Sequence, residues 1–520
     1  MIRPSPRPRA ALLPTAPNMF TQTWRRHWGL EDDPFVQEDA DKDPVLPRVA
    51  EEAVHSSFDR LFGDPRMPGP GVVFGEKGSG KSGLRLAMRR RLEGPDLRAF
   101  VVEYTEFDAF LNEARKADRL PPHGAMTPRR VVERFGLSDH LDAILCLGVS
   151  RLCREVVEGK HAAARSLVPK QKASLLTLAA LFHRSDDLSG LELHGALRRA
   201  LRARRPLALA RRLGQLSMVL LGAALIADAN LELPFELPPV PRPEAGVQTL
   251  AGAALVGAAA LWAAVRRLWL RGRAGVAIRA IRVVPRDPEP LARLLQRVPP
   301  SIRRDLALPD GGSVGSRLVL LQRFVSILRE LGHDSFYVLM DRVDEATMLA
   351  GRAELMRPFV EPLLEHRLLQ FDGLALKLFL PIELSRLYLG ASPEQLKSMR
   401  LDKANTIPEL RWTGQELAQV ASQRLAAVRS ADVDAAAPGA RLADHFADDI
   451  TEEELRGTLA ELGTPRLAFG FLGAVLAEHA RDLADGLPAD APEWRVPRRR
   501  FDILRANWLD RARGLRRALN

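Results

Sequence analysis

The chain alternates between short runs of consecutive apolar residues and longer stretches in which apolar residues recur every three or four positions. The short runs occupy residues 72–74, 99–104, 336–340 and 374–381. A short apolar run rich in branched side chains is typical of a parallel strand buried on both faces, whereas the wider spacing is typical of a helix with one apolar face. The pattern therefore predicts an α/β fold with a parallel sheet and a large helical complement.

Two uncharged stretches interrupt this pattern in the middle of the chain. Residues 245–265 contain 21 positions without a charge, and residues 213–227 contain 15. At about 1.5 Å per residue, the longer stretch is enough to cross a hydrocarbon core of about 30 Å. The shorter one must extend back to residue 206 and let Arg211 and Arg212 reach the interface, or thin the bilayer locally. We expect a transmembrane hairpin with spans at about 206–227 and 245–265; the alternative is a helical hairpin buried in a soluble domain.

Arginines flank this hairpin on both sides, whereas the connection between its helices is acidic. Because positively charged flanks stay in the cytoplasm, we expect a multi-pass protein of the inner, cytoplasmic membrane with both termini in the cytoplasm. Small residues at Gly252, Ala253 and Gly257 would let the second helix pack closely on the first. The flanking arginines are Arg198, Arg199, Arg202, Arg204, Arg205, Arg211, Arg212, Arg266, Arg267, Arg271 and Arg273, and the acidic residues of the connection are Asp228, Glu232, Glu236 and Glu244.

The apolar run at residues 72–74 leads into a glycine-rich turn. Gly75 is followed by four residues and then by Gly80, Lys81 and Ser82, with a helix-compatible sequence directly behind. A strand, such a turn and a helix N-terminus together form a phosphate-binding loop; the alternative is a chance glycine-rich turn. Lys81 would reach the β- and γ-phosphates and act in catalysis, and the Ser82 hydroxyl would ligate Mg²⁺. We expect ATP to bind at Gly75, Glu76, Lys77, Gly78, Ser79, Gly80, Lys81 and Ser82.

A strand that ends in a carboxylate follows far along the chain. The apolar residues 336–340 lead to Asp341, and Asp344 and Glu345 come within the next turn. Ligands bind beyond the carboxyl ends of strands in open α/β sheets, so Asp341 is expected to hold Mg²⁺ together with Ser82. Glu345 or Asp344 would orient the attacking water. The alternative is an acidic turn after a core strand.

This arrangement of residues resembles the Walker B element of the STAND and NACHT branch of P-loop NTPases. The usual AAA+ version has a glutamate directly after the aspartate, where this chain has Arg342, so Glu345 is the favoured base. The run at residues 374–381 is similar to the sensor strand that lies beside the Walker B strand in AAA+ and STAND proteins. Its expected polar tip is absent, since Pro381 ends the run and Glu383 is the nearest polar residue.

Segments outside the strands resemble the same class. Residues 24–35 contain a Gly-Leu-x-x-x-Pro-Phe element similar to one in secretion-pathway AAA ATPases, where it packs beside the nucleotide. Leu-Arg-Trp-Thr at residues 410–413 resembles the junction to a helical lid. Gly-Thr-Pro-Arg at residues 463–466 is similar to a lid turn that presents a sensor arginine, here Arg466, to the γ-phosphate; the alternative is a helix-capping turn.

The tail from Trp494 is rich in arginine. A basic amphipathic helix is typical of a surface that docks on anionic lipid or a partner protein, and its arginines would neutralise nucleic-acid phosphates equally well. The net charge of +11 and the isoelectric point near 10.1 suit such partners. We expect anionic membrane lipid as a partner, together with a homo-oligomer or a protein partner; nucleic acid is the alternative. The apolar stripe of the tail is Leu504, Trp508, Ala512, Leu515 and Leu519.

Histidines and cysteines supply no metal site in this interpretation. His140, His161 and His183 lack carboxylate or cysteine partners at ligand spacing, so each is expected at the surface or in packing. Cys146 and Cys153 are expected as small buried thiols in a reducing compartment.

A hairpin between the Walker A and Walker B segments resembles the KAP group of membrane-inserted P-loop NTPases, whose Walker B usually ends in Asp-Arg after two aspartates, unlike this one. We expect a membrane-anchored, cytoplasm-facing ATPase that couples Mg-ATP hydrolysis to conformational switching or assembly. The alternatives are a nucleotide-gated signalling or defence scaffold with little turnover, and a nucleic-acid-dependent ATPase. The expected division is a disordered leader (1–23), two halves of the NTPase domain (24–195 and 274–411), the hairpin (196–273), a helical lid (412–493) and the basic tail (494–520).

Overall fold

The fold is known from a computed structural model. Of the expected leader, only residues 21–23 belong to the part of the chain that the structure describes. The described residues are 21–35, 39–49, 55–117, 127–184, 190–203, 206–231, 245–364, 366–389, 405–430, 432, 438–484 and 486–519.

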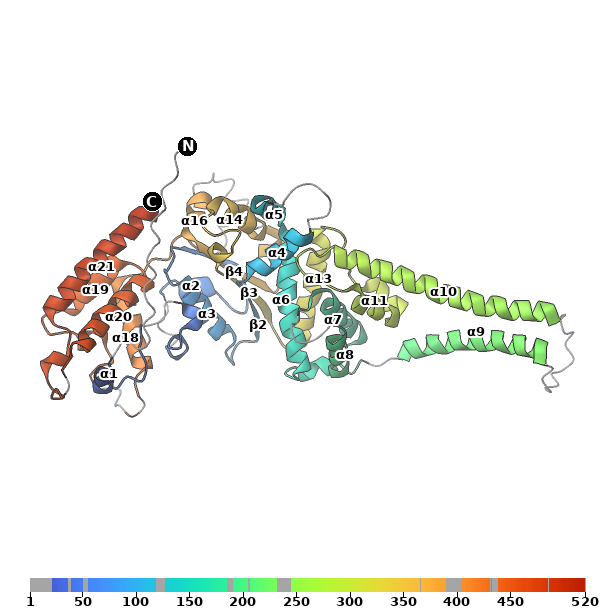
Figure 1. Ribbon diagram of the computed structural model, residues 1–520, viewed down its shortest axis with the longest axis horizontal. Coiled ribbons are helices and arrows are strands. Elements are labelled where there is room, and N and C mark those ends of the chain that lie inside the picture. Colours follow the sequence, from blue (N-terminus) through green and yellow to red (C-terminus); the bar gives the residue numbers. More distant parts are fainter. Residues whose placement is uncertain are drawn as a thin grey trace, which may run out of the picture.

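A five-stranded parallel sheet forms the centre of the molecule (Figure 1). Its order is β2-β3-β4-β1-β5, so β4 lies between the strand that precedes Gly75 and the strand that leads to Asp341. The predicted neighbourhood of residues 336–340 and 374–381 is confirmed, because Phe336 pairs with Leu374 and Met340 with Leu378. The strands are β1 (Gly71–Gly75), β2 (Ala99–Tyr104), β3 (Ser335–Met340), β4 (Leu374–Pro381) and β5 (Asn405–Ile407).

Both faces of the sheet are covered by helices, which explains the uninterrupted apolar runs. Along β3, Val338 and Met340 join the core shared with α6 and α13, whereas Tyr337 and Leu339 join the core shared with α2 and α3. The helices around the sheet are α2 (Phe58–Phe62), α3 (Lys81–Leu92), α4 (Phe107–Ala117), α5 (Pro128–Arg134), α6 (Leu137–Val157), α7 (Pro169–Phe182), α8 (Gly190–Ala200), α11 (Pro288–Arg297), α12 (Pro300–Asp305), α13 (Val314–Glu330), α14 (Ala353–Val360), α15 (His366–Leu369) and α16 (Ile382–Leu389).

A second hydrophobic core lies in the C-terminal helical domain, at the left in Figure 1. Trp24 and Trp28 of α1 belong to this core, and so do Val45 and Val49. The structure therefore differs from the expected division, in which the NTPase domain begins at residue 24. We define the helical domain as residues 21–49 together with 412–519; its helices are α1 (Gln22–Trp28), α18 (Gly414–Ala427), α19 (Glu452–Leu462), α20 (Pro465–Arg481) and α21 (Arg498–Leu519), and its short 3-10 turns include η1 (Ala40–Lys42) and η2 (Leu46–Arg48).

Two antiparallel helices, α9 (Pro206–Leu231) and α10 (Ala245–Arg279), form a hairpin that projects from the body (Figure 1). They cross closely at two glycines: a Cβ on Gly252 would lie 2.6 Å from the carbonyl oxygen of Gly222. Gly257, in contrast, faces open space. Most large apolar side chains along the hairpin are exposed, so the alternative of a hairpin buried in a soluble domain is wrong.

The two helices of the hairpin differ in apolar length. Among the described residues, one helix, Gly246–Arg279, is long and apolar enough to cross a membrane by length and composition. The apolar part of α9 is confined to Leu216–Ala229, about 20 Å of helix. Two full spans are therefore not supported. The end of α10 extends beyond the expected span and is anchored in the main core through Leu270 and Ala274.

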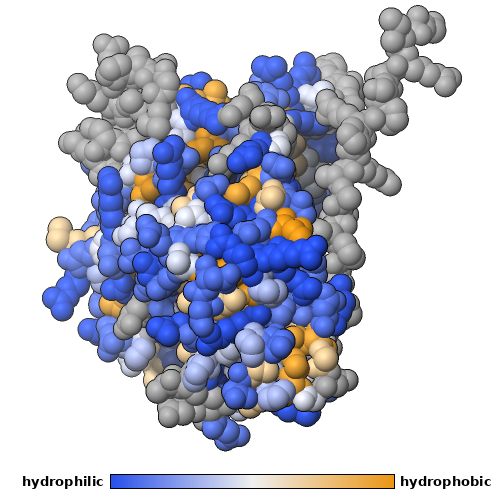
Figure 2. All heavy atoms as spheres, turned by 90° about the vertical axis from the view of Figure 1, so that its left-hand side faces the viewer, coloured by the Kyte–Doolittle hydropathy of each residue, from blue (hydrophilic) through white to orange (hydrophobic). Residues whose placement is uncertain are grey.

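The expected tail helix is part of the helical domain. Part of its apolar stripe packs within this domain, since the Trp508 ring covers Gly470 of α20 and Ala512 is buried, whereas Leu515 is 48% exposed. Arg498 donates to both carboxylate oxygens of Glu454 at 2.8 Å. The middle of the stripe therefore packs inside the helical domain. Figure 2, which looks onto this end of the molecule, shows a largely hydrophilic surface.

Candidate functional site

The loop of residues 75–82 connects β1 to α3 in a conformation that only glycine adopts without strain. Gly78 and Gly80 have φ of +86° and +90°. Gly75 is required for a different reason, since a Cβ there would lie 2.4 Å from the Ser79 hydroxyl oxygen. The glycines that the sequence singled out are therefore required by the shape of this loop.

Lys81, the first residue of α3, is buried and folds back over the loop. Its ammonium donates to the carbonyl oxygens of Gly75 at 2.7 Å and Glu76 at 3.0 Å. Burial lowers the pKa of Lys81, and the nearby carboxylates of Asp344 and Asp341 oppose this shift in that order. The ammonium therefore lies among carboxylates beside the loop.

Ser82 and Asp341, 259 positions apart in the sequence, are in direct contact. The Ser82 hydroxyl donates to Asp341 Oδ2 at 2.7 Å. Asp341 follows β3 and is buried, and it also accepts from the backbone N–H of Arg342 at 2.8 Å. The sequence predicted both residues as ligands of one Mg²⁺, and the structure brings their oxygens together.

An arginine that the sequence analysis missed completes the surroundings of Asp341. Arg85 is buried on α3, and its Nε lies 3.2 Å from Asp341 Oδ2. The same guanidinium pairs with Glu103 of β2 and with Asp41 of η1. Its position one turn after Ser82 on the same helix was the available signal, because residues three apart share a helix face.

Arg342, which stands where the usual AAA+ pattern has a glutamate, turns away from Asp341. It adopts a left-handed backbone with φ of +66°, and its guanidinium pairs with Asp39 at 2.7 Å and with Asp41. Arg342 and Arg85 thus tie residues 39–41 of the helical domain to the ends of β3 and α3. No short-range sequence pattern predicts this, because Asp39 is 303 positions from Arg342 and Asp41 is 44 positions from Arg85.

The two candidate bases are placed differently. Glu345 is on the surface, with 55% of its side chain exposed, and its carboxylate lies 3.6 Å from Arg342. Asp344 is half-buried and is the carboxylate that most strongly stabilises charged Lys81. Glu383, at the start of α16, acts on Lys81 in the same direction. The geometry therefore favours Asp344 over Glu345 as the group that faces the 75–82 loop.

The helical domain contacts the outer side of this loop. Trp412 donates its indole N–H to the carbonyl oxygen of Ser79 at 2.7 Å. The backbone N–H of Arg466 donates to the carbonyl oxygen of Gly78 at 3.3 Å, and the Arg466 side chain covers Gly78. The turn is also a helix cap, with Thr464 as N-cap and Pro465 in the first turn of α20. The capping turn and the arginine beside the loop therefore coexist.

An apolar cavity of about 110 Å³ opens next to Gly80, between α3 and the helical domain. Its walls come from Leu84 and Ala87 on one side and from Leu46, Trp412 and Phe469 on the other. The sequence gave no indication of this cavity, because its walls come from three distant segments.

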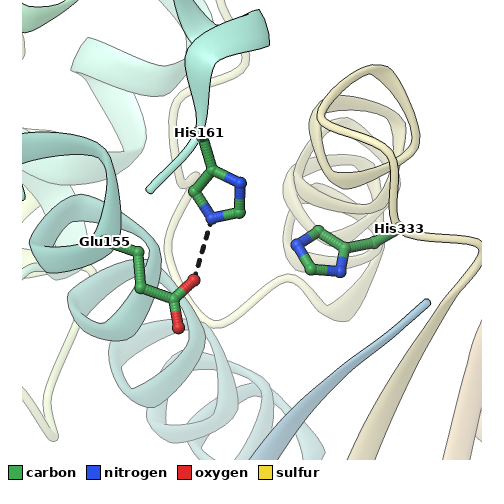
Figure 3. Close-up of side chains that lie close together, drawn as sticks. All are labelled: Glu155, His161 and His333. Carbon is green, nitrogen blue, oxygen red and sulfur yellow. Dashed lines mark hydrogen bonds and ion pairs between the residues drawn. The ribbon is translucent and has the colours of Figure 1, made fainter. Parts of the chain in front are cut away.

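The histidines that were set aside behave in different ways. His140 is fully buried; its Nε2–H donates to the carbonyl oxygen of Phe359 at 2.7 Å, and its Nδ1 accepts from the Tyr104 hydroxyl at 3.1 Å, as expected for packing. His161 does have a carboxylate partner, contrary to expectation: its Nε2 lies 2.9 Å from Glu155 (Figure 3).

His333 lies beside the His161–Glu155 pair, so that three groups suited to a metal lie within 4.8 Å of one another. Arg151 also binds Glu155, at 2.8 Å. Partial burial would raise the pKa of Glu155, but its hydrogen bonds to His161 and Arg151 outweigh this and lower the pKa to about 2. Glu155 is therefore already bound by Arg151 and His161. Both cysteines are buried free thiols, and burial raises the pKa of each.

Comparison with protein-family models, with curated proteins and with solved structures found no match to this chain. The functional argument therefore depends on the site itself.

Proposed function

We propose that this protein is a membrane-anchored, cytoplasm-facing ATPase of the AAA+/STAND class, in which hydrolysis of Mg-ATP is coupled to movement of the helical domain. The observation that carries the proposal is the contact between the Ser82 hydroxyl and the Asp341 carboxylate at the mouth of a glycine-rich loop. These two groups come from the helix after β1 and from the end of β3. This contact is what is expected if both oxygens ligate one cation beside a bound polyphosphate.

The donor set at this point fits Mg²⁺. A serine hydroxyl and an aspartate carboxylate are hard oxygen ligands, and Mg²⁺ binds through one or two such groups plus water and phosphate oxygens. When bound, Mg²⁺ would neutralise charge on the β- and γ-phosphates. Arg85, at 3.2 Å from Asp341, holds that carboxylate in position.

The backbone N–H groups of the 75–82 loop and the N-terminus of α3 would bind the phosphates, because both present positive potential to an anion. Lys81, now folded onto the carbonyl oxygens of Gly75 and Glu76, would swing to the β- and γ-phosphates. Asp344 would accept a hydrogen bond from the attacking water and orient it toward the γ-phosphate.

The apolar cavity beside Gly80 suits the nucleotide base. It lies at the start of α3, on the side of the loop where Trp412 packs. A flat aromatic base is held largely by apolar and aromatic walls. Because these walls belong to α3 and to the helical domain, a bound base would fix the two parts together, and Arg466 would link the same domain to the phosphates.

The hairpin supports a membrane location. Its apolar side chains are exposed along both helices, and both helices return to the same body. A complete crossing by α10 therefore requires α9 to cross too, with the apolar segment Leu216–Ala229 thinning the bilayer. We propose insertion of the hairpin tip first, with the arginine-rich ends at the cytoplasmic surface.

A scaffold with little turnover is the second candidate, and Arg342 in place of the usual glutamate favours it. Steady-state ATP hydrolysis by the full chain, with and without liposomes, separates the two. We expect turnover that requires Mg²⁺ and that Lys81→Ala abolishes. Lys116→Ala, which removes an exposed lysine on α4, is the matched control and should keep it. Tight ATP binding without any turnover would instead favour the scaffold function over the ATPase function.

A further inference from the structure

A second cavity lies between α8 and α11, where the hairpin leaves the body (Figure 1). Its volume is about 650 Å³. Among the described residues that line it there is no aspartate or glutamate, while five are arginines: Arg198, Arg199, Arg202, Arg293 and Arg297.

Five guanidinium groups around one hollow repel one another and raise a positive potential inside it. Such a concentration of one sign of charge attracts a counter-ion, and low-dielectric walls strengthen the effect. Glu289 pairs with Arg293 at 2.7 Å, and Arg198 and Arg297 also have partners within the chain, but the charged side chains that line the cavity itself, among the described residues, are all arginines. The cavity therefore suits a ligand with more than one negative charge.

His194 gives a second, independent indication. It is only 8% exposed, lines the cavity, and its Nδ1 has no hydrogen-bond partner in the described structure. A buried polar atom without a partner is costly, and a bound oxygen would satisfy it. Burial and the neighbouring arginines lower the pKa of His194 to about 4, so the ring is neutral at pH 7 and retains one N–H to donate.

The position of the cavity along the hairpin indicates that the anion belongs to a lipid headgroup. Trp262 and Trp269 on α10 are each 55% exposed, and exposed tryptophans are typical of the level of lipid headgroups. Arg266, between them, donates to the carbonyl oxygen of Gln296 at 3.2 Å. Gln296 directly precedes Arg297, so the wall of the cavity that contains Arg297 lies beside the part of α10 that carries the two tryptophans.

We propose that the cavity between α8 and α11 binds the phosphate-bearing headgroup of an anionic phospholipid. The inference uses the proposed insertion of the hairpin, which would bring headgroups to the mouth of the cavity. Arginine suits phosphate because its planar group donates two parallel hydrogen bonds to phosphate oxygens. Lipid bound between α8 and α11 would brace the base of the hairpin against the body.

The test measures thermal unfolding of the full chain in a neutral detergent, without nucleotide. Cardiolipin or phosphatidylglycerol should raise Tm, since a ligand that binds only the folded state stabilises it. In Arg198→Gln/Arg202→Gln/Arg297→Gln the apparent lipid affinity should fall at least about tenfold. The matched control Arg129→Gln/Arg441→Gln/Arg513→Gln removes three exposed arginines elsewhere and should respond as the wild type does.

Three outcomes would overturn the proposal. Equal lipid response in the two triple variants would exclude the cavity as the site. An equal rise of Tm with inorganic phosphate or pyrophosphate would assign the cavity to a soluble anion. No response of the wild type to any anion would exclude a site altogether. If the triple variant does not fold, judged from its Tm without lipid, Arg198→Gln and Arg297→Gln are measured singly.

Flotation with phosphatidylcholine vesicles, which carry no net charge, tests hairpin insertion separately. If the protein does not float with these vesicles but still binds anionic lipid in detergent, the proposed membrane insertion is wrong and the proposed lipid site in the cavity stands.

Discussion

Asp341 accepts hydrogen bonds from the Ser82 hydroxyl, from Arg85 and from the Arg342 backbone, which makes it the most completely held carboxylate of the candidate site. Ser82 and Asp341 could be named from the sequence because a strand end and a glycine-rich turn mark them. Arg85 was marked only by its place one turn after Ser82, and the pairing of Asp39 and Asp41 could not be predicted, because it depends on how distant segments pack.

The two carboxylates after Asp341 give a prediction at this scale. Asp344→Asn should lower kcat at least about a hundredfold with little change in ATP affinity, since it removes the group that orients the water. Glu345→Gln should keep kcat within about threefold, because Glu345 is exposed and paired with Arg342. Steady-state kinetics of both variants measures the difference. Loss of turnover in Glu345→Gln alone would restore Glu345 as the base.

Among the elements, the existence of the two hairpin helices could be predicted from the sequence, whereas their end points could not. The uncharged stretches marked both helices, and Gly252 was among the small residues expected at the contact. The expected span stops at residue 265, where the arginines begin, but α10 continues to Arg279, since no proline interrupts it. In the tail, periodicity marks an apolar stripe but does not say which element covers it.

The crossing of α9 and α10 can be tested by two matched substitutions. Gly252→Val should lower the free energy of unfolding by about 1–3 kcal/mol, because its side chain would collide with the backbone of Gly222. Gly257→Val places the same side chain on the same helix in open space and should have little effect. Thermal unfolding in one detergent compares them. Equal destabilisation would mean that the close contact at Gly252 does not hold the hairpin together.

At the scale of the whole molecule, the N-terminal segment belongs to the C-terminal domain. Trp24 and Trp28 pack around His445, with ring centroids 5.4 Å and 4.4 Å from it. Because these residues are more than 400 positions apart, one sequence alone does not predict that they pack together. The consequence is that residues 39–41 bridge the helical domain to Arg85 and Arg342.

This packing predicts a pH dependence. Burial lowers the pKa of His445 to about 4, from about 6.5 in the unfolded chain. Below pH 6.5 the unfolded state binds a proton at His445, whereas the folded state does not. The contribution of neutral His445 to the free energy of unfolding is therefore complete above pH 6.5. It is lost as the pH falls toward 4, by up to about 3 kcal/mol. His445→Gln should unfold with a shallower dependence on pH over this range.

Denaturant titrations at several pH values measure the free energy of unfolding of both proteins and thus this dependence. Asp142 acts in the opposite direction, because burial raises its pKa to about 7, and it provides the same background in wild type and variant. Parallel pH profiles for wild type and His445→Gln would contradict the buried neutral state of His445.

The most direct test of the central claim is calorimetric titration of ATP into the full chain with and without Mg²⁺. The account predicts that the wild type and Lys116→Ala bind Mg-ATP, that Lys81→Ala does not, and that Asp341→Asn loses the enhancement by Mg²⁺. Equal affinity of the wild type and Lys81→Ala for Mg-ATP, or an affinity that Mg²⁺ does not change, would contradict a nucleotide site at Ser82 and Asp341.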